Sequence, residues 1–127
     1  MSLLDNFTVF NFKEGVPYVS ITTNGFTFNR SVVMKLNYPN NVLLLLNIEE
    51  QQIAIVPCDE AEENATSFYK PKKSEIISVR WNGKDLLNTL QDMMGWDLSK
   101  QTYKVEGYHL KEENAMLFDF KKATVLA

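Results

Sequence analysis

Apolar and polar side chains alternate along the chain in the way expected of strands with one buried face. Val19 and Ile21, for example, are separated by Ser20 and followed by Thr22. Apolar-rich segments predict further strands at residues 42–47, 52–56, 103–108 and 115–120. Short polar stretches at 48–51 and 111–114 lie between these strands, and we expect them to close two hairpins.

A helical spacing follows the first strand. Phe28, Val32 and Leu36 recur every four residues, which places them on one face of a helix. Asn29 is suited to cap the start of this helix, and Pro39 is suited to end it.

A second stripe of the same kind follows at Leu86, Leu90 and Met94. Gly95 comes next, where a helix often ends in a left-handed residue. The sequence therefore predicts two short helices, each placed between a strand and a hairpin.

The two sets of elements indicate an internal repeat. Val19–Gly25 matches Ile77–Gly83 at an offset of 58, since both read apolar, Ser, apolar, two further residues, Asn, Gly. A second match, at an offset of 63, aligns residues 49–55 with 112–118. We therefore divide the chain into repeats 19–57 and 77–120, a connector at 58–76, and an N-terminal strand or cap at 1–18.

The predicted fold class is α+β and mainly β, within a single domain of 127 residues. Each βαββ repeat is too small to bury a core of its own, so two of them are expected to share one core as a pseudo-dimer. The pattern leaves two arrangements open: an intertwined barrel, or two repeats packed side by side.

The residues that carry the repeat resemble the AbrB/MazE swapped-hairpin domain. In the first copy these residues are Ile21–Phe28, the helix to Leu36-Asn37, and a hairpin ending Ile53–Pro57. The second copy resembles the family through Asn82-Gly83-Lys84, the stripe to Met94-Gly95, and 115–120. The resemblance implies an intertwined β-barrel of two halves, here on one chain, and DNA binding for transcriptional or antitoxin control.

The family's DNA-contact residues are largely unmatched. Members typically carry an arginine after the glycine, where this chain has Phe26 and Lys84. A basic pair is common in the helix, where this chain has Val33-Met34 and Gln91-Asp92. The remaining candidates for DNA or anion contact flank the Asn-Gly pairs or the helices after them: Arg30, Lys35, Arg80 and Lys84.

Charge weakens the expectation of DNA binding, because affinity for a duplex comes largely from Lys and Arg at phosphates. The formal net charge of the chain is -3. Residues 19–57 are neutral overall, and residues 77–120 carry five basic and seven acidic side chains. Neither repeat is a basic module, so a mixed surface of solvated charges is the alternative interpretation.

Another candidate surface lies in the predicted connector, where aromatic and basic residues surround a proline. This candidate partner-binding patch comprises Phe68, Tyr69, Lys70, Lys72 and Lys73. The alternative is a plain connector without a partner.

Catalytic chemistry finds little support in the sequence. His109 is the only histidine and lacks nearby ligands for a metal site. Cys58 is the only cysteine, and its acidic neighbours Asp59 and Glu60 should raise the pKa of its thiol. We expect no enzyme activity, no metal and no cofactor.

Function is therefore expected to rest on binding. The first hypothesis is a non-catalytic binding module, a diverged AbrB-like transcriptional regulator. The alternative is a protein-interaction or structural module that does not bind DNA. The longest apolar run has only five residues, so we expect a cytoplasmic protein without a membrane span, either monomeric or a homodimer.

Overall fold

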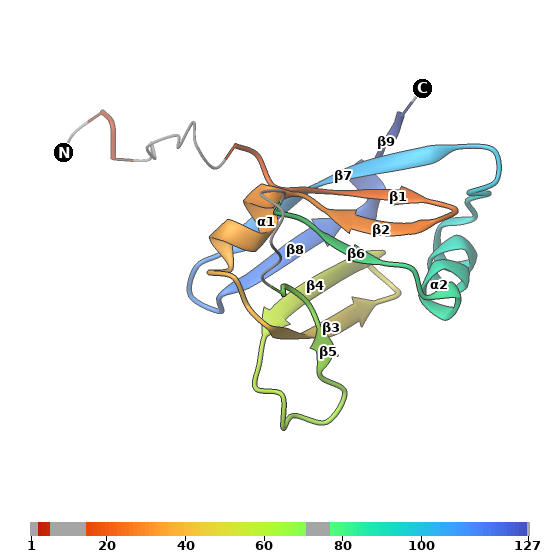
Figure 1. The fold of residues 1–127 in the computed structure, drawn as a ribbon. Coiled ribbons are helices and arrows are strands. Elements are labelled where there is room, and N and C mark those ends of the chain that lie inside the picture. Colours follow the sequence, from red (N-terminus) through yellow and green to blue (C-terminus); the bar gives the residue numbers. More distant parts are fainter. Residues whose placement is uncertain (1–2, 6–14, 71–76, 127) are drawn as a thin grey trace.

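One strongly curled antiparallel sheet forms the centre of the molecule in the computed structural model, which describes residues 3–5, 15–70 and 77–126 (Figure 1). Its strands are β1 (Tyr18–Thr22), β2 (Gly25–Phe28), β3 (Asn41–Asn47), β4 (Gln52–Pro57), β5 (Thr66–Ser67), β6 (Val79–Trp81), β7 (Thr102–Leu110), β8 (Ala115–Asp119) and β9 (Thr124–Leu126). Two α-helices, α1 (Arg30–Lys35) and α2 (Lys84–Met94), and a 3-10 turn at Phe120–Lys122 complete the fold. The predicted N-terminal strand or cap falls mostly outside the described residues.

The strands follow the order β5-β3-β4-β8-β7-β1-β2-β6, and β9 lies beside β7. The curl brings the two end strands, β5 and β6, toward each other. The indole N–H of Trp81 in β6 donates a hydrogen bond of 3.1 Å to the backbone carbonyl of Ser67 in β5. A side chain thus bridges the seam between these two strands.

Strands from the first and second halves of the chain pair with one another. β1 pairs with β7, and β5 pairs with β3. Two further pairs join the halves: β4 pairs with β8, and β2 pairs with β6. Each half therefore contributes strands to both sides of the sheet.

The mainly β fold with two short helices is confirmed, as are the strands expected at 42–47, 52–56, 103–108 and 115–120. The offset of 58 is wrong as a structural match. Asn24 and Gly25 join β1 to β2, and Gly25 has a φ of 138°. Gly83 instead has a φ of -65° and directly precedes α2. Phe28, expected on the first helix, ends β2.

The offset of 63 aligns hairpins of similar geometry. Gln51 and Asn114 occupy the same position in the two hairpin turns, and their φ angles are 55° and 50°. The backbone N–H of each donates to the carbonyl three residues earlier, at 3.3 Å in both cases. The predicted connector, by contrast, contains β5, so the second series of strands begins earlier than residue 77.

The core fills the concave side of the sheet because apolar residues alternate inward along the strands. Phe28 is fully buried and contacts the rings of Phe68, Trp81 and Phe118, with centroids 5.0–5.8 Å apart. The two helices lie at opposite ends of the strands (Figure 1). The buried residues that the helices add include Val32 and Val33 from α1 and Leu87 and Leu90 from α2.

The predicted helix ends are confirmed by local hydrogen bonds. The side-chain oxygen of Asn29 accepts from the backbone N–H groups of Val32 and Tyr18, at 3.3 and 3.0 Å. Asn29 therefore caps α1 and also fastens it to β1. Gly95 ends α2 with a left-handed φ of 68°, and its N–H donates to the carbonyl of Gln91.

Candidate binding surfaces

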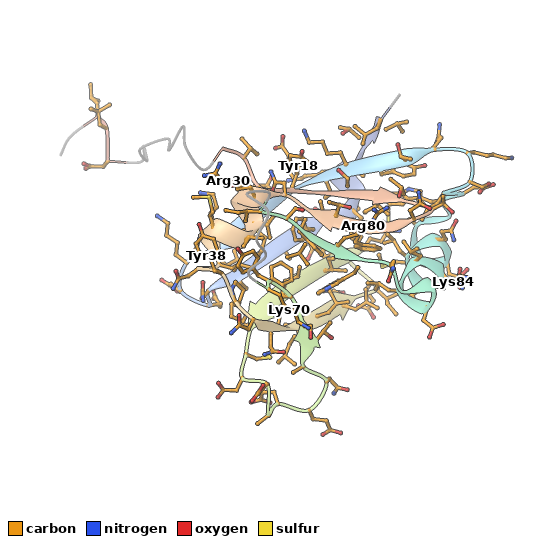
Figure 2. The ribbon with its side chains drawn as sticks, viewed as in Figure 1. Tyr18, Arg30, Tyr38, Lys70, Arg80 and Lys84 are labelled. Atoms are coloured by element: carbon orange, nitrogen blue, oxygen red, sulfur yellow. The ribbon has the colours of Figure 1, made fainter. Side chains whose placement is uncertain are left out.

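The four basic residues expected to contact DNA are spread across the molecule. Arg30 is the first residue of α1 and Lys84 the first of α2, and they lie at opposite ends of the sheet, with Arg80 between them (Figure 2). Lys35 is in the last turn of α1, where a cation complements the helix dipole. The structure therefore does not bring these residues together as one contact surface.

The aromatic part of the predicted partner patch is structural. Phe68 is only 6% exposed and packs between Phe28 and Trp81, so the prediction that it contacts a partner is wrong. Tyr69 is half-buried against the ring of Tyr38, at 5.4 Å between centroids. Lys70 is exposed, and Lys72 and Lys73 lie outside the described residues.

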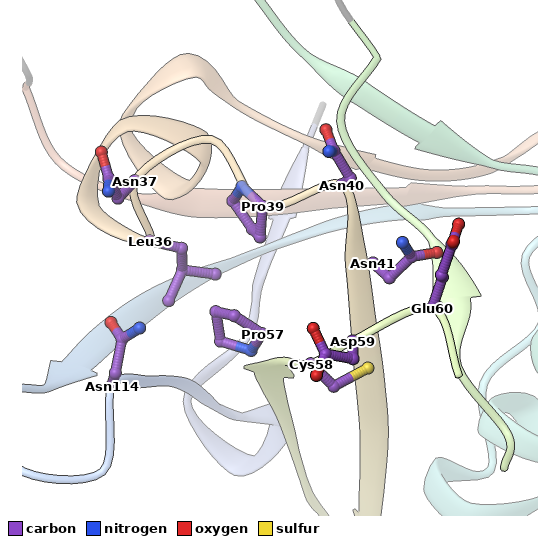
Figure 3. Close-up of a pocket in the computed structure, with 10 residues that line it drawn as sticks. All are labelled: Leu36, Asn37, Pro39, Asn40, Asn41, Pro57, Cys58, Asp59, Glu60 and Asn114. Carbon is purple, nitrogen blue, oxygen red and sulfur yellow. The ribbon is translucent and has the colours of Figure 1, made fainter. Parts of the chain in front are cut away.

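An open depression of about 570 Å³ lies beside the end of α1 (Figure 3). Leu36, Pro39 and Pro57 supply its apolar side chains. Its polar side chains are those of Asn37, Asn40, Asn41, Asn114, Cys58, Asp59 and Glu60. These ten residues include no lysine, arginine or histidine, so the depression offers amides and carboxylates but no basic side chain.

The thiol of Cys58 lies in this depression. Burial raises its pKa, and the charges of Glu62 and Asp59 raise it further. The expected direction and the contribution of Asp59 agree with the prediction, but burial is the largest cause and the other carboxylate is Glu62 rather than Glu60. A thiol held protonated is a weak nucleophile.

The imidazole of His109 has an amide as its hydrogen-bond partner, since its Nε2 lies 3.3 Å from Oδ1 of Asn114. Within residues 3–5, 15–70 and 77–126, no group of three His, Cys, Asp or Glu side chains could hold a metal ion.

The convex side of β3, β4, β8 and β7 carries an unusual number of apolar side chains. The register places Leu45 beside Ala54, Ala54 beside Leu117, and Leu117 beside Tyr108. Leu45 is 50% exposed and Tyr108 is 51% exposed. We define the apolar face as Leu43, Leu45, Ala54, Val56, Leu110 and Leu117, and none of these six belongs to the core cluster.

A signal for this face was present in the sequence. Residues 42–46 form a continuous apolar run, whereas a strand with one wet face should alternate. Such a run indicates a strand that is covered on both sides. The core covers one side, through Val42 and Leu44.

The convex side of β6, β2, β1, β7 and β9 has a different composition. One row of paired residues runs across these five strands: Arg80, Thr27, Ser20, Lys104 and Thr124. The Nζ of Lys104 lies 4.2 Å from the ring centroid of Tyr18, and the Nζ of Lys122 lies 5.4 Å from that of Tyr108. We call Tyr18, Arg80, Lys104, Tyr108, Lys122 and Thr124 the cation–tyrosine face.

Comparisons of the chain with protein-family models, with curated proteins and with solved structures found no match. In the part of the chain that the structure describes, neither helix has the length and apolar character needed to cross a membrane.

Proposed function

We propose that the protein is a non-catalytic binding module that packs its apolar face against another protein surface. The observation that carries this proposal is the row of apolar residues across four strands, at Leu45, Ala54, Leu117 and Tyr108. Contiguous exposed apolar surface on a folded protein is typical of interaction sites. Covering the exposed half of Leu45 alone would contribute about 1 kcal/mol.

The dimensions of the face suit a sheet or a helix of a partner. Four strands spaced about 4.8 Å apart span roughly 15 Å, and successive rows lie about 7 Å apart. Leu46 and Ile48 are also exposed, but Leu46 pairs with the buried Ile53 and therefore lies on the concave side, outside the apolar face.

The occupant that we propose is a second copy of the chain. A two-fold dimer brings the same surface patch together from both subunits, so the patch must complement itself. The six residues of the apolar face carry no charge, and two such faces can pack as aligned sheets without burying an unpaired ion.

Sedimentation over a wide range of protein concentration tests the proposal. We expect a reversible dimer whose population falls in the double variant Leu45→Lys, Leu117→Lys. The matched control is the double variant Thr27→Lys, Thr124→Lys, which adds the same two charges in the polar row on the other convex surface and should leave the dimer intact. A wild-type chain that stays monomeric at every concentration would contradict the proposed occupant.

A DNA-binding regulator like those of the AbrB/MazE family is the second candidate. Its support is the pairing of strands between halves, because β1 pairs with β7 and β5 pairs with β3, as an intertwined and duplicated barrel requires. The separation of Arg30 from Lys84 weakens it. A mobility shift with duplex fragments at low salt tests this candidate, and no shift would remove it.

A further inference from the structure

We propose that the cation–tyrosine face binds a single-stranded nucleic acid, with its lysines at the phosphates and its tyrosines stacked on bases. This inference concerns the other convex surface of the sheet, and Tyr108 is the one residue that it shares with the row that carries the proposed dimer. The two surfaces meet at Tyr108, which pairs with Leu117 on one side and has Lys122 over its ring.

Two lysines, Lys104 in β7 and Lys122 in the 3-10 turn, line the same depression on this face. Lys104 lies opposite Ser20 on one side and Thr124 on the other. Lys122 comes two residues before Thr124, at the end of the 3-10 turn that leads into β9. The side chains of both lysines line one depression of about 290 Å³, together with Glu106, Tyr108 and Thr124.

This depression offers the groups that bind a phosphate. Two ammonium groups supply charge and hydrogen-bond donors, whereas the hydroxyl of Thr124 already donates to the backbone carbonyl of Lys104 at 3.4 Å. Glu106 is the one carboxylate in the depression, and it lies opposite Tyr18 in the strand register. Arg80, Lys104 and Lys122 together outnumber it, so the face is locally positive on a chain with a net charge of -3.

The tyrosines point to a single strand rather than a duplex. Tyr108 is 51% exposed, Tyr18 is half-buried, and both rings already attract a cation. A base can stack on such a ring only when it is free of its own partner strand, and each stacked base contributes about 1–3 kcal/mol. The face has only three cationic side chains, Arg80, Lys104 and Lys122. Binding of a duplex depends on many phosphate contacts, so these three favour a short single strand.

Arg80 extends the face toward the edge of the sheet. It lies three strands from Lys104, which is roughly 14 Å at the usual spacing, with the small hydroxyl residues Thr27 and Ser20 between. A short single strand that follows this row across the convex surface would meet a cation at each end.

Fluorescence anisotropy with labelled oligothymidylate and oligouridylate tests the inference. We expect weak binding at low salt that falls with rising salt with a slope of about -1.4, as for two phosphates on a single strand. The double variant Lys104→Glu, Lys122→Glu should abolish binding. The variant Tyr108→Leu should weaken binding about tenfold, which corresponds to the loss of one stacked base.

Two controls separate a specific face from general attraction of anions. The double variant Lys100→Glu, Lys111→Glu changes the net charge by the same amount at exposed lysines outside the cation–tyrosine face, and it should leave binding nearly unchanged. Inorganic polyphosphate should bind more weakly than the oligonucleotides, because it has no bases. The inference is overturned if no oligonucleotide binds at low salt, if the control variant weakens binding as much as the face variants, or if polyphosphate binds equally well and Tyr108→Leu has no effect.

Discussion

The two convex surfaces of the sheet differ far more than the two parts of its concave side. On the concave side, Ile53 and Phe118 from one part and Val19 and Val105 from the other are all buried. On the convex side, β3, β4 and β8 present leucine, alanine and valine, whereas β6, β2 and β1 present arginine, threonine and serine. The inner residues thus specify a common core, and the outer residues distinguish two kinds of surface.

β7 makes this contrast visible within a single strand. Its outward residues begin with Thr102 and Lys104 and end with Tyr108 and Leu110. The same strand therefore passes from the polar surface to the apolar one, and Tyr108 marks the boundary. The difference suggests that the two surfaces meet different partners, and substitutions on each side can test how independent they are.

The largest effect is expected at Gly25, where the backbone of β6 lies very close to the β1–β2 turn. An added Cβ would lie 2.2 Å from the carbonyl oxygen of Trp81 in the adjacent β6. Because backbone must move and the φ of 138° disfavours a side chain, Gly25→Ala should lower the free energy of unfolding by about 3 kcal/mol. Urea unfolding followed by tryptophan fluorescence measures this loss.

Gly107 provides the matched comparison on the other side. Its added Cβ would meet the side chains of Met116 and Phe118, at 2.8 and 2.9 Å. Side chains can shift where backbone cannot, so Gly107→Ala should cost only about 1 kcal/mol. A larger loss at Gly107 than at Gly25 would reverse the comparison.

The next effect concerns Asp119 at the end of β8, whose side chain is 13% exposed. Burial alone would raise the pKa of its carboxyl, but hydrogen bonds from the backbone and ammonium of Lys121 outweigh burial and hold the pKa below its usual 3.8. Its contribution to stability is therefore present above the unfolded pKa and is lost as pH falls through the folded value. Asp119→Ala should cost about 1–2 kcal/mol at neutral pH.

Unfolding of Asp119→Ala and wild type should be compared between neutral and strongly acid pH. The difference in their free energies of unfolding should shrink as the pH falls below 3.8. Glu112→Ala, an exposed carboxylate on the β7–β8 turn, serves as the control. A difference that stays constant with pH would rule out the charge of Asp119 as its cause.

A smaller effect is expected at the seam between β5 and β6. Trp81→Phe keeps an aromatic ring against Phe28 but removes the hydrogen bond to Ser67, at a cost of about 1 kcal/mol. Hydrogen exchange should quicken in β5 while β4 and β8 stay protected. Equal loss of protection in all strands would show that the seam is not a separate weak point.

The smallest effect is expected on the apolar face itself. Leu45 is half exposed and lies outside the core cluster, so Leu45→Lys should change the free energy of unfolding by less than about 0.5 kcal/mol. Leu44→Lys provides the contrast, because Leu44 packs against the core and its replacement should be clearly destabilising. Similar losses at both positions would mean that Leu45 serves the fold rather than a partner.

Much of the fold was predictable because it depends on local signals. The helix cap at Asn29, the left-handed Gly95 and the hairpins at 48–51 and 111–114 all follow from short-range chemistry. The correspondence of repeats was harder, since Val19–Gly25 and Ile77–Gly83 share a pattern but not a structure. A short match of alternating residues does not show whether the Asn-Gly pair after a strand forms a hairpin turn, as after β1, or precedes a helix, as after β6.

The candidate surfaces were less predictable, because they depend on which strands become neighbours. The row from Arg80 to Thr124 joins the β1–β2 hairpin to three strands from much later in the sequence, β6, β7 and β9. The prediction that Phe68 contacts a partner was wrong for the same reason, since the burial of Phe68 depends on packing against Phe28 and Trp81. The apolar run at 42–46 is the one candidate surface that the sequence pattern could have predicted, because it indicates a strand covered on both sides.

The pairing of strands from the two halves also has a consequence for how the chain can be divided. A cut in the loop between β4 and β5 would separate β1 from the β7 that pairs with it, and β5 from the β3 that pairs with it. Each fragment would lack partners that only the other fragment supplies. We therefore expect that neither fragment folds by itself, and that the two fragments gain strand structure only when they are mixed.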